Sequence, residues 1–98
     1  MALKTKKFDI QDHLTSPAER AAYLAAAFEE ADEAFIKQAL SDIARSMGMT
    51  EVAKTAQITR EGLYKALGKA GDPKLSTLLG IARALDVQLT VEPREVAA

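Results

Sequence analysis

The stretch TEVAKTAQITREGLYKAL, residues 50–67, constrains the fold more than any other part of the chain. It contains two short helical patterns, and only Gln57 and Ile58 separate them, so the chain must turn tightly there. Thr50 and Thr59 are expected to cap the two helices, because a threonine hydroxyl accepts hydrogen bonds from the free N–H groups of a first helical turn. The stretch therefore predicts two short helices that meet at a sharp corner.

Two longer helices are predicted before this corner. The pattern SPAE, residues 16–19, is a capping box with proline at the first helical position, and it predicts a helix that continues to about residue 30. Asp32 can cap a second helix, which Gly48 would end in a left-handed conformation. Asp32 could instead mark only a kink, and the two helices would then be continuous. Apolar residues at three- and four-residue steps predict one buried stripe along the second helix, formed by Ile36, Leu40, Ile43 and Met47.

The sequence after the corner predicts one more helix and then a strand. The loop GKAGDP, residues 68–73, is rich in turn-forming residues and leads into an amphipathic pattern. The stretch Val87–Glu92 alternates with a period of two and predicts a short strand, and Phe8–Ile10 is a candidate for a second one. An uncovered apolar strand is unfavourable, so it should pair with the N-terminal strand or with a second subunit. The inward side chains of the helix are expected to be Leu75, Leu78, Leu79, Ala82 and Leu85.

A length of 98 residues is enough for one domain with a single modest core. We divide it into a strand and helical extension at residues 1–34, a helical core at 35–87, and a strand and tail at 88–98. The chain has no cysteine, which excludes disulfides and thiolate metal sites. No apolar run approaches the roughly 20 residues that span a bilayer, and the N-terminal sequence lacks the apolar region of a secretory signal. We therefore expect a cytoplasmic protein with no membrane partner.

Catalytic and metal sites are not expected. His13 has no cysteine or second histidine with which to hold a metal ion. No serine has a histidine base in a plausible motif for nucleophilic catalysis. The acidic run at residues 29–33 is most often a solvated helix end, and the alternative is a surface that binds a basic protein partner. We predict no enzymatic activity, no metal and no cofactor.

Charge is unevenly distributed along the chain. Residues 49–86 carry six basic and four acidic side chains, a net charge of +2, whereas the remainder sums to −3. A locally basic segment in an acidic protein indicates an anionic partner on one face. If Leu63 and Leu67 face the core, the polar side chains of the second corner helix must face outward.

Short helices with a tight turn between two of them are typical of a helix-turn-helix domain, in which the second helix of the corner contacts DNA bases. Arg60 would then contact guanine and Glu61 cytosine, with Lys65 one turn further along the helix. Gly62 has no side chain, so the start of this helix could approach DNA closely. Glu61 could instead only restrain Arg60 and Lys65, and the whole set could be an ordinary solvated face. Contacts with the DNA backbone are assigned to Thr50, Thr59, Tyr64, Lys69 and Lys74.

The stretches TEVAKTAQITREGLYKAL and DPKLSTLLGIARALDV resemble the Cro/CI-type (XRE) helix-turn-helix family. Ala53, Ile58, Leu63 and Pro73 fit that family's pattern. Gln57 departs from it, because glycine is common at this turn and a left-handed conformation costs another residue about 1 kcal/mol. The resemblance implies an all-α, lambda-repressor-like domain with an N-terminal helical extension and one or two short strands.

Nearly the whole chain, from FDIQDHL and AAYLAAAFEEAD to the C-terminal helix, resembles the small antidote proteins of bacterial addiction modules, and its most specific motif is ITREGLYKALGKAGDP, residues 58–73. This resemblance implies a DNA-binding antitoxin of a type II toxin–antitoxin module. Such a protein would neutralise a cognate RelE/ParE-like toxin and, as a homodimer, would bind double-stranded operator DNA and repress its own operon. Two alternatives remain open, a stand-alone helix-turn-helix transcriptional regulator without a toxin partner and a protein-interaction domain without DNA binding. The net charge of only −1 is the best support for the second alternative.

Overall fold

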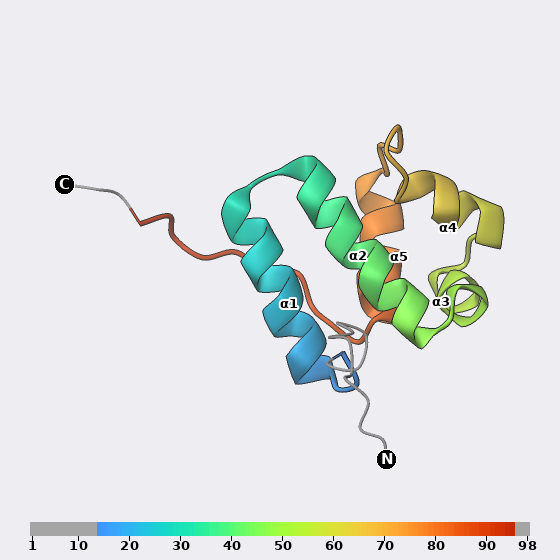
Figure 1. The fold of residues 1–98 in the computed structure, drawn as a ribbon, viewed down its shortest axis with the longest axis horizontal. Coiled ribbons are helices and arrows are strands. Elements are labelled where there is room, and N and C mark those ends of the chain that lie inside the picture. Colours follow the sequence, from blue (N-terminus) through green and yellow to red (C-terminus); the bar gives the residue numbers. More distant parts are fainter. Residues whose placement is uncertain (1–13, 96–98) are drawn as a thin grey trace, which may run out of the picture.

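The computed structural model describes residues 14–95, and this range contains five helices and no strand (Figure 1). Helix α2 lies between α1 on one side and the group of α3, α4 and α5 on the other, and α3 packs most extensively against α5. The all-α prediction is therefore confirmed for this part of the chain. The bounds of the helices are α1 (Pro17–Glu30), α2 (Glu33–Met47), α3 (Met49–Ala56), α4 (Arg60–Ala66) and α5 (Leu75–Ala84).

Helices α1 and α2 are separate, and each has its own N-cap. The capping box at the start of α1 is complete, because the Glu19 N–H donates to Ser16 Oγ and the Ser16 N–H donates to Glu19 Oε1, both over 3.1 Å. Ala31 adopts a left-handed conformation and ends α1. The Asp32 carboxylate then accepts a hydrogen bond of 3.0 Å from the Ala34 N–H. Asp32 therefore caps a new helix rather than marking a kink in a continuous one.

The start of α3 differs from the prediction. Gly48 both ends α2 and serves as the N-cap of α3, and its φ of +102° is accessible to glycine with little strain. The chain can therefore turn within one residue, which makes Met49 the first residue of α3 and buries its side chain. Thr50 consequently lies inside the first turn, and the prediction that Thr50 caps this helix is wrong.

The turn between α3 and α4 follows the prediction. Gln57 is left-handed, with φ of +64°, so this glutamine accepts the conformation that glycine would adopt more cheaply. The Ile58 N–H donates to the Ala53 carbonyl over 3.0 Å, which uses a carbonyl at the end of α3. Thr59 caps α4, because its Oγ1 accepts from the Gly62 N–H over 2.8 Å. Two short helices thus meet at a sharp corner.

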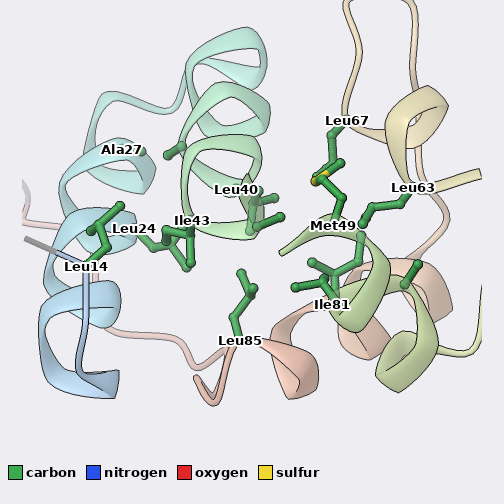
Figure 2. Packing of buried hydrophobic residues seen from close by; sticks show 14 residues of the cluster. Leu14, Leu24, Ala27, Leu40, Ile43, Met49, Leu63, Leu67, Ile81 and Leu85 are labelled. Atoms are coloured by element: carbon green, nitrogen blue, oxygen red, sulfur yellow. The ribbon is translucent and has the colours of Figure 1, made fainter. Parts of the chain in front are cut away.

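The core lies where α2 faces the other four helices (Figure 2). Ile43, Leu63 and Ile81 are completely buried, and burial of each such side chain contributes about 1.5–3 kcal/mol. Leu63 and Leu67 both face inward, as predicted for α4. The larger members of this cluster are Leu14, Leu24, Leu40, Ile43, Met49, Val52, Leu63, Leu67, Ile81 and Leu85.

The inward face of α5 was only partly predicted. Leu75 is 67% exposed and Leu79 is 45% exposed, so both assignments to the core are wrong. The cause is the approach of α5 to α3, because a Cβ on Gly80 would lie only 3.1 Å from the carbonyl oxygen of Ala56. This close contact fixes the rotation of α5 so that Ile81 faces the core, which leaves Leu79 on the outer side.

Residues 85–95, which follow α5, contain no strand. Asp86 is left-handed, and the Val87 N–H donates to the Ala82 carbonyl, which ends the helix. The predicted strand Val87–Glu92 has no strand beside it among residues 14–95, and a strand forms only when its backbone groups pair with a neighbour. The other predicted strand, Phe8–Ile10, lies outside the described residues. Residues 88–95 instead run exposed past α1 (Figure 1).

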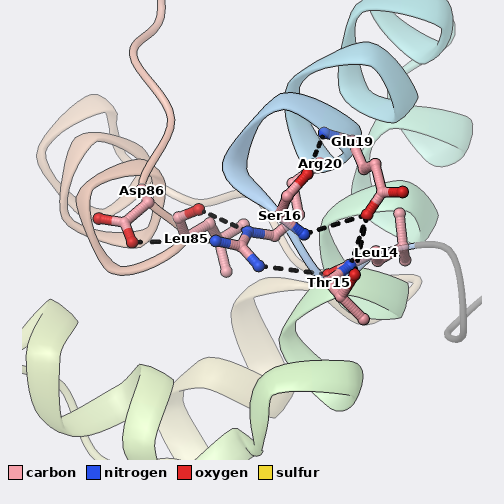
Figure 3. Close-up of polar contacts among 7 residues, drawn as sticks. All are labelled: Leu14, Thr15, Ser16, Glu19, Arg20, Leu85 and Asp86. Carbon is pink, nitrogen blue, oxygen red and sulfur yellow. Dashed lines mark hydrogen bonds and ion pairs between the residues drawn. The ribbon is translucent and has the colours of Figure 1, made fainter.

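One buried arginine joins the first helix to the end of the last one (Figure 3). The Arg20 side chain donates to the Leu85 carbonyl over 2.9 Å and to the Leu14 carbonyl over 3.2 Å. Its remaining nitrogen lies 3.8 Å from a carboxylate oxygen of Asp86. A buried guanidinium is tolerated here because its donors meet backbone carbonyls that lack helical partners.

None of the helices within residues 14–95 has the length and apolar character that crossing a membrane requires.

Candidate nucleic-acid interface

The eight residues that the sequence assigns to DNA contact are all exposed, and they lie on α3, α4 and the segments flanking α4. Helix α4 carries four of them on its outer side, because Leu63 and Leu67 occupy its inner side. Thr59 lies at the start of α4, and Thr50 lies in the first turn of α3. Lys69 and Lys74 lie in the loop between α4 and α5. The four outer residues of α4 are Arg60, Glu61, Tyr64 and Lys65.

Arg60 and Tyr64 lie together on this face, one helical turn apart. The guanidinium carbon of Arg60 is 5.4 Å from the centre of the Tyr64 ring, and its Nη2 donates to the phenolic oxygen over 3.4 Å. Among residues 14–95, the carboxylate of Glu61 forms no ion pair with Arg60 or Lys65. Glu61 is therefore not held by its neighbours in the unbound protein.

The sequence did not indicate Arg45, which also contacts Tyr64. Arg45 lies in the last turn of α2, and its guanidinium carbon is 5.7 Å from the centre of the Tyr64 ring. Its Nε donates to Ser41 Oγ over 3.2 Å, which fixes the direction of the side chain. Tyr64 thus brings two exposed arginines from different helices together. No local spacing connects residues 45 and 64, so only the packing of α2 near α4 reveals this pair.

Gly62 has a structural role at the start of α4, in addition to the close approach to DNA that the sequence predicts. It is half-buried, and a Cβ at this position would lie 3.0 Å from Thr59 Oγ1. The absence of a side chain therefore makes room for the hydroxyl that caps α4. The Thr59 hydroxyl accepts one hydrogen bond in this cap, and its own proton remains able to donate to a phosphate oxygen.

Lys37, another residue that the sequence did not single out, holds the loop between α4 and α5. It is buried on α2, and its ammonium group donates to the carbonyl oxygens of Lys69 and Gly71 over 3.1 and 2.6 Å. A Cβ on Gly71 would overlap the carbonyl oxygens at the end of α4, so the loop lies directly against that helix. The loop that carries Lys69 and Lys74 is therefore fixed from both sides.

Cationic side chains and hydroxyls are exposed along α4, at the start of α3 and in the loop before α5. Hydroxyls and exposed N–H groups at the starts of helices suit phosphate oxygens, and outward arginine and lysine side chains suit phosphates and base edges. No group of three or more histidine, cysteine or acidic side chains lies close enough within residues 14–95 to hold a metal ion. These exposed side chains are thus suited to binding an anionic polymer.

Comparisons with known proteins cover almost the whole chain. The sequence profile of a family described as "probable addiction module antidote protein" matches residues 4–93. A protein of Haemophilus influenzae that has the name "uncharacterized protein" is 40% identical over 97 residues, which span 99% of this chain and all of the relative. No solved structure matches the chain significantly. The profile match therefore shows the family, and it agrees with the resemblance found in residues 58–73.

Proposed function

The chain belongs to the family of probable addiction module antidote proteins, and we propose that it is the DNA-binding antitoxin of a type II toxin–antitoxin module. The family description, an addiction module antidote, supports the antitoxin part of this proposal. The finer parts of the proposal are that it neutralises a RelE/ParE-like toxin and represses its own operon. The mechanism is steric, with no enzymatic step.

One observation carries the DNA-binding part of the proposal. Helix α4 begins at a sharp corner after α3, buries Leu63 completely and exposes its polar side chains on the opposite side. This arrangement suits a recognition helix that enters the major groove. Arg60 would read guanine, Glu61 would accept from cytosine, and Lys65, one helical turn further on, would also contact a base edge. Contacts with the phosphate backbone are assigned to Thr50, Thr59, Tyr64, Lys69 and Lys74.

The frame around α4 supports a Cro/CI-type, lambda-repressor-like reading of the fold. Helices α3 and α4 are the helix-turn-helix pair in this proposal, and α2 and α5 support them from behind. The left-handed Gln57 and the cap at Thr59 set the angle between the pair. A homodimer would place two copies of α4 one DNA turn apart, about 34 Å, and would read a two-fold symmetric operator.

A stand-alone transcriptional regulator without a toxin is the second candidate function. The exposed cationic side chains of α4 support it as much as they support a DNA-binding antitoxin. Family membership separates the two, because an antidote implies a toxin partner.

A protein-interaction domain without DNA binding is the third candidate. The exposed set of Arg45, Arg60 and Lys65 argues against it, because such a domain needs no cluster of outward cations at a helix corner.

The decisive experiment measures two bindings with purified protein. The first is binding to a labelled fragment of its own promoter, with a scrambled fragment of equal length as the control. The second is binding to the product of the reading frame beside its gene. The proposal expects specific promoter binding and a stable complex that restores growth to cells expressing the neighbouring protein. Promoter binding without any such complex would favour the stand-alone regulator. A complex without DNA binding at low salt would favour the interaction domain.

A further inference from the structure

None of the eight residues assigned to DNA contact lines an apolar groove of about 540 Å³, although its lining residues Pro73 and Leu75 flank Lys74. It runs between α1, α2 and α5, and the exposed segment after α5 contributes one wall. Two of its large side chains are unusually exposed, because Phe28 is 45% and Leu75 is 67% accessible to solvent. A folded protein gains nothing by leaving such side chains in water, so exposed apolar grooves of this kind mark binding sites. The main apolar lining residues are Leu24, Phe28, Ile36, Leu75, Leu78 and Leu89.

The rim of this groove carries a net negative charge. Glu33 and Asp72 are exposed lining residues, and the corner between α1 and α2 adds the exposed carboxylates of Glu29, Glu30 and Asp32. Lys37 also lines the groove, but it is buried and its ammonium group is engaged by the loop carbonyls. Lys74 is an exposed basic neighbour of the lining, and the carboxylates outnumber it. The groove therefore favours a partner that is apolar in the middle and basic at its edges.

We propose that this groove is the docking surface for the toxin, and that it takes a basic amphipathic segment of that protein. The inference rests on the proposed function, because it names the surface for the partner that an antidote implies. Operator DNA is excluded as the occupant, since a polyanion would be repelled by the acidic rim. A second copy is disfavoured, because a two-fold symmetric contact through this groove would place the same carboxylates opposite each other.

The exposed side chains also argue for a macromolecular occupant. Phe28 and Leu75 line the groove but remain 45% and 67% exposed, so a small ligand that filled the groove would leave much of both side chains in water. A protein segment that covers both would bury them fully. Aromatic and leucine side chains that become fully desolvated at an interface dominate the binding energy.

The chain offers matched control residues for a test. Phe28 and Phe35 have almost equal exposure, 45% and 46%, but only Phe28 lines the groove. Leu75 and Leu79 lie on the same helix and are both exposed, but only Leu75 lines it. Glutamate at position 75 is also compatible with folding, because an acidic residue in the first turn of a helix is favourable.

The experiment measures the affinity of the purified full chain for the purified RelE/ParE-like protein encoded beside it. Phe28→Ala and Leu75→Glu are expected to weaken this binding about tenfold or more. Phe35→Ala and Leu79→Glu are expected to leave it within about twofold of the wild type, which is the usual range for residues outside an interface. All four variants should keep the helical circular dichroism spectrum, and Phe28→Ala, which lies far along the chain from Lys74, should also keep promoter binding, so that lost docking is separated from lost folding.

The negative charge of the groove rim is tested separately, by measuring how toxin binding depends on salt. The double variant Glu33→Gln, Asp72→Asn should bind the toxin more weakly at low salt and should show a flatter dependence of affinity on salt, because fewer charges attract the partner. An unchanged salt dependence would overturn the assignment to a basic segment.

Three results would contradict the docking surface. If the wild type binds the toxin and the groove variants bind as tightly as the controls, the groove is not the surface, although the proposed function stands. If the groove variants instead break a homodimer in sedimentation and leave toxin binding intact, the occupant is a second copy. If the wild type shows no affinity for the toxin at all, both the inference and the toxin part of the proposed function are wrong.

Discussion

The ammonium group of Lys37 donates a hydrogen bond of 2.6 Å to the carbonyl oxygen of Gly71, 34 residues further along the chain. A second bond of 3.1 Å reaches the Lys69 carbonyl. One buried lysine on α2 thereby holds the loop that carries Lys69 and Lys74 at the candidate DNA interface. Because the ammonium group is buried with two acceptors, these bonds are worth more than an exposed ion pair would be.

Replacing Lys37 by methionine should lower the free energy of unfolding by about 1–3 kcal/mol, because two loop carbonyls lose their donor while the apolar stem is kept. It should also weaken binding to promoter DNA, since the loop lysines would no longer be fixed. Lys54→Met is the control, because Lys54 is an exposed lysine on α3. Urea denaturation gives the stability difference, and equal stability of the two variants would contradict this role.

Arg20 and Asp86 should differ strongly in their effect on stability, although they form an ion pair. Arg20→Met removes two buried hydrogen bonds to backbone carbonyls and is expected to cost about 2–4 kcal/mol. Asp86→Asn removes only the charge of a 69% exposed side chain at 3.8 Å, so it should cost less than about 1 kcal/mol. Asparagine also tolerates the left-handed conformation of residue 86. Similar costs for both variants in thermal denaturation would show that the ion pair matters more than the carbonyl bonds.

Tyr23 gives a prediction about pH. Burial raises the pKa of its phenol to about 12, and the hydrogen bond of 2.6 Å to the Asp42 carboxylate and the charge of that carboxylate act in the same direction. The ordinary tyrosine pKa near 10 applies to the unfolded chain. The folded state thus resists loss of the proton, so this contribution to stability is complete below about pH 10 and is lost as the pH rises from about 10 to about 12.

The chain has two tyrosines, so the measurement uses the Tyr64→Phe variant, in which only Tyr23 remains. Its absorbance titration should have a midpoint near 12 in the folded protein and near 10 in denaturant. Adding Asp42→Asn should lower the folded midpoint, because the carboxylate's contribution disappears while the effect of burial stays. Equal midpoints in the folded and denatured states would contradict the role of burial.

Arg45 and Tyr64 should be coupled in stability. The ring and the guanidinium meet at an exposed site, where a cation–π contact contributes about 0.5–1 kcal/mol. A double-mutant cycle with Arg45→Met and Tyr64→Leu should therefore give a coupling energy in this range, whereas Lys54→Met with Tyr64→Leu should give none. Coupling below about 0.3 kcal/mol, the usual limit of additivity, would mean that the contact is not energetically significant.

Local signals in the sequence predicted the local structure well. The capping box at Ser16, the cap at Thr59 and the inward Leu63 each depend on residues within one or two helical turns. The position of Thr50 was wrong for a local reason too, because Gly48 can end one helix and begin the next. Sequence spacing alone could not show whether Gly48 or Thr50 would be the N-cap of α3.

Features that depend on distant parts of the chain could not be predicted. The rotation of α5 follows from the contact of Gly80 with Ala56, so it left Leu79 outside despite an apolar pattern that suggested the core. The strand at Val87–Glu92 was wrong because alternation predicts a strand only when a partner backbone lies beside it. Lys37 and Arg45 were missed for the same reason, since their partners lie 19 or more residues away.

The separate roles of Arg60 and Lys74 in the proposed DNA complex give the last prediction. Arg60→Ala should reduce the preference for the operator over other sequences by about 1–3 kcal/mol, because a base contact is lost. Lys74→Ala should weaken binding to every sequence and lower the slope of log affinity against log salt by about 1, because one phosphate contact is lost. The measurement is a salt titration of binding to operator and scrambled DNA, with Lys54→Ala as a third exposed cation. If both variants behave alike on the two DNAs, the division between base and backbone contacts is wrong, although DNA binding itself would stand.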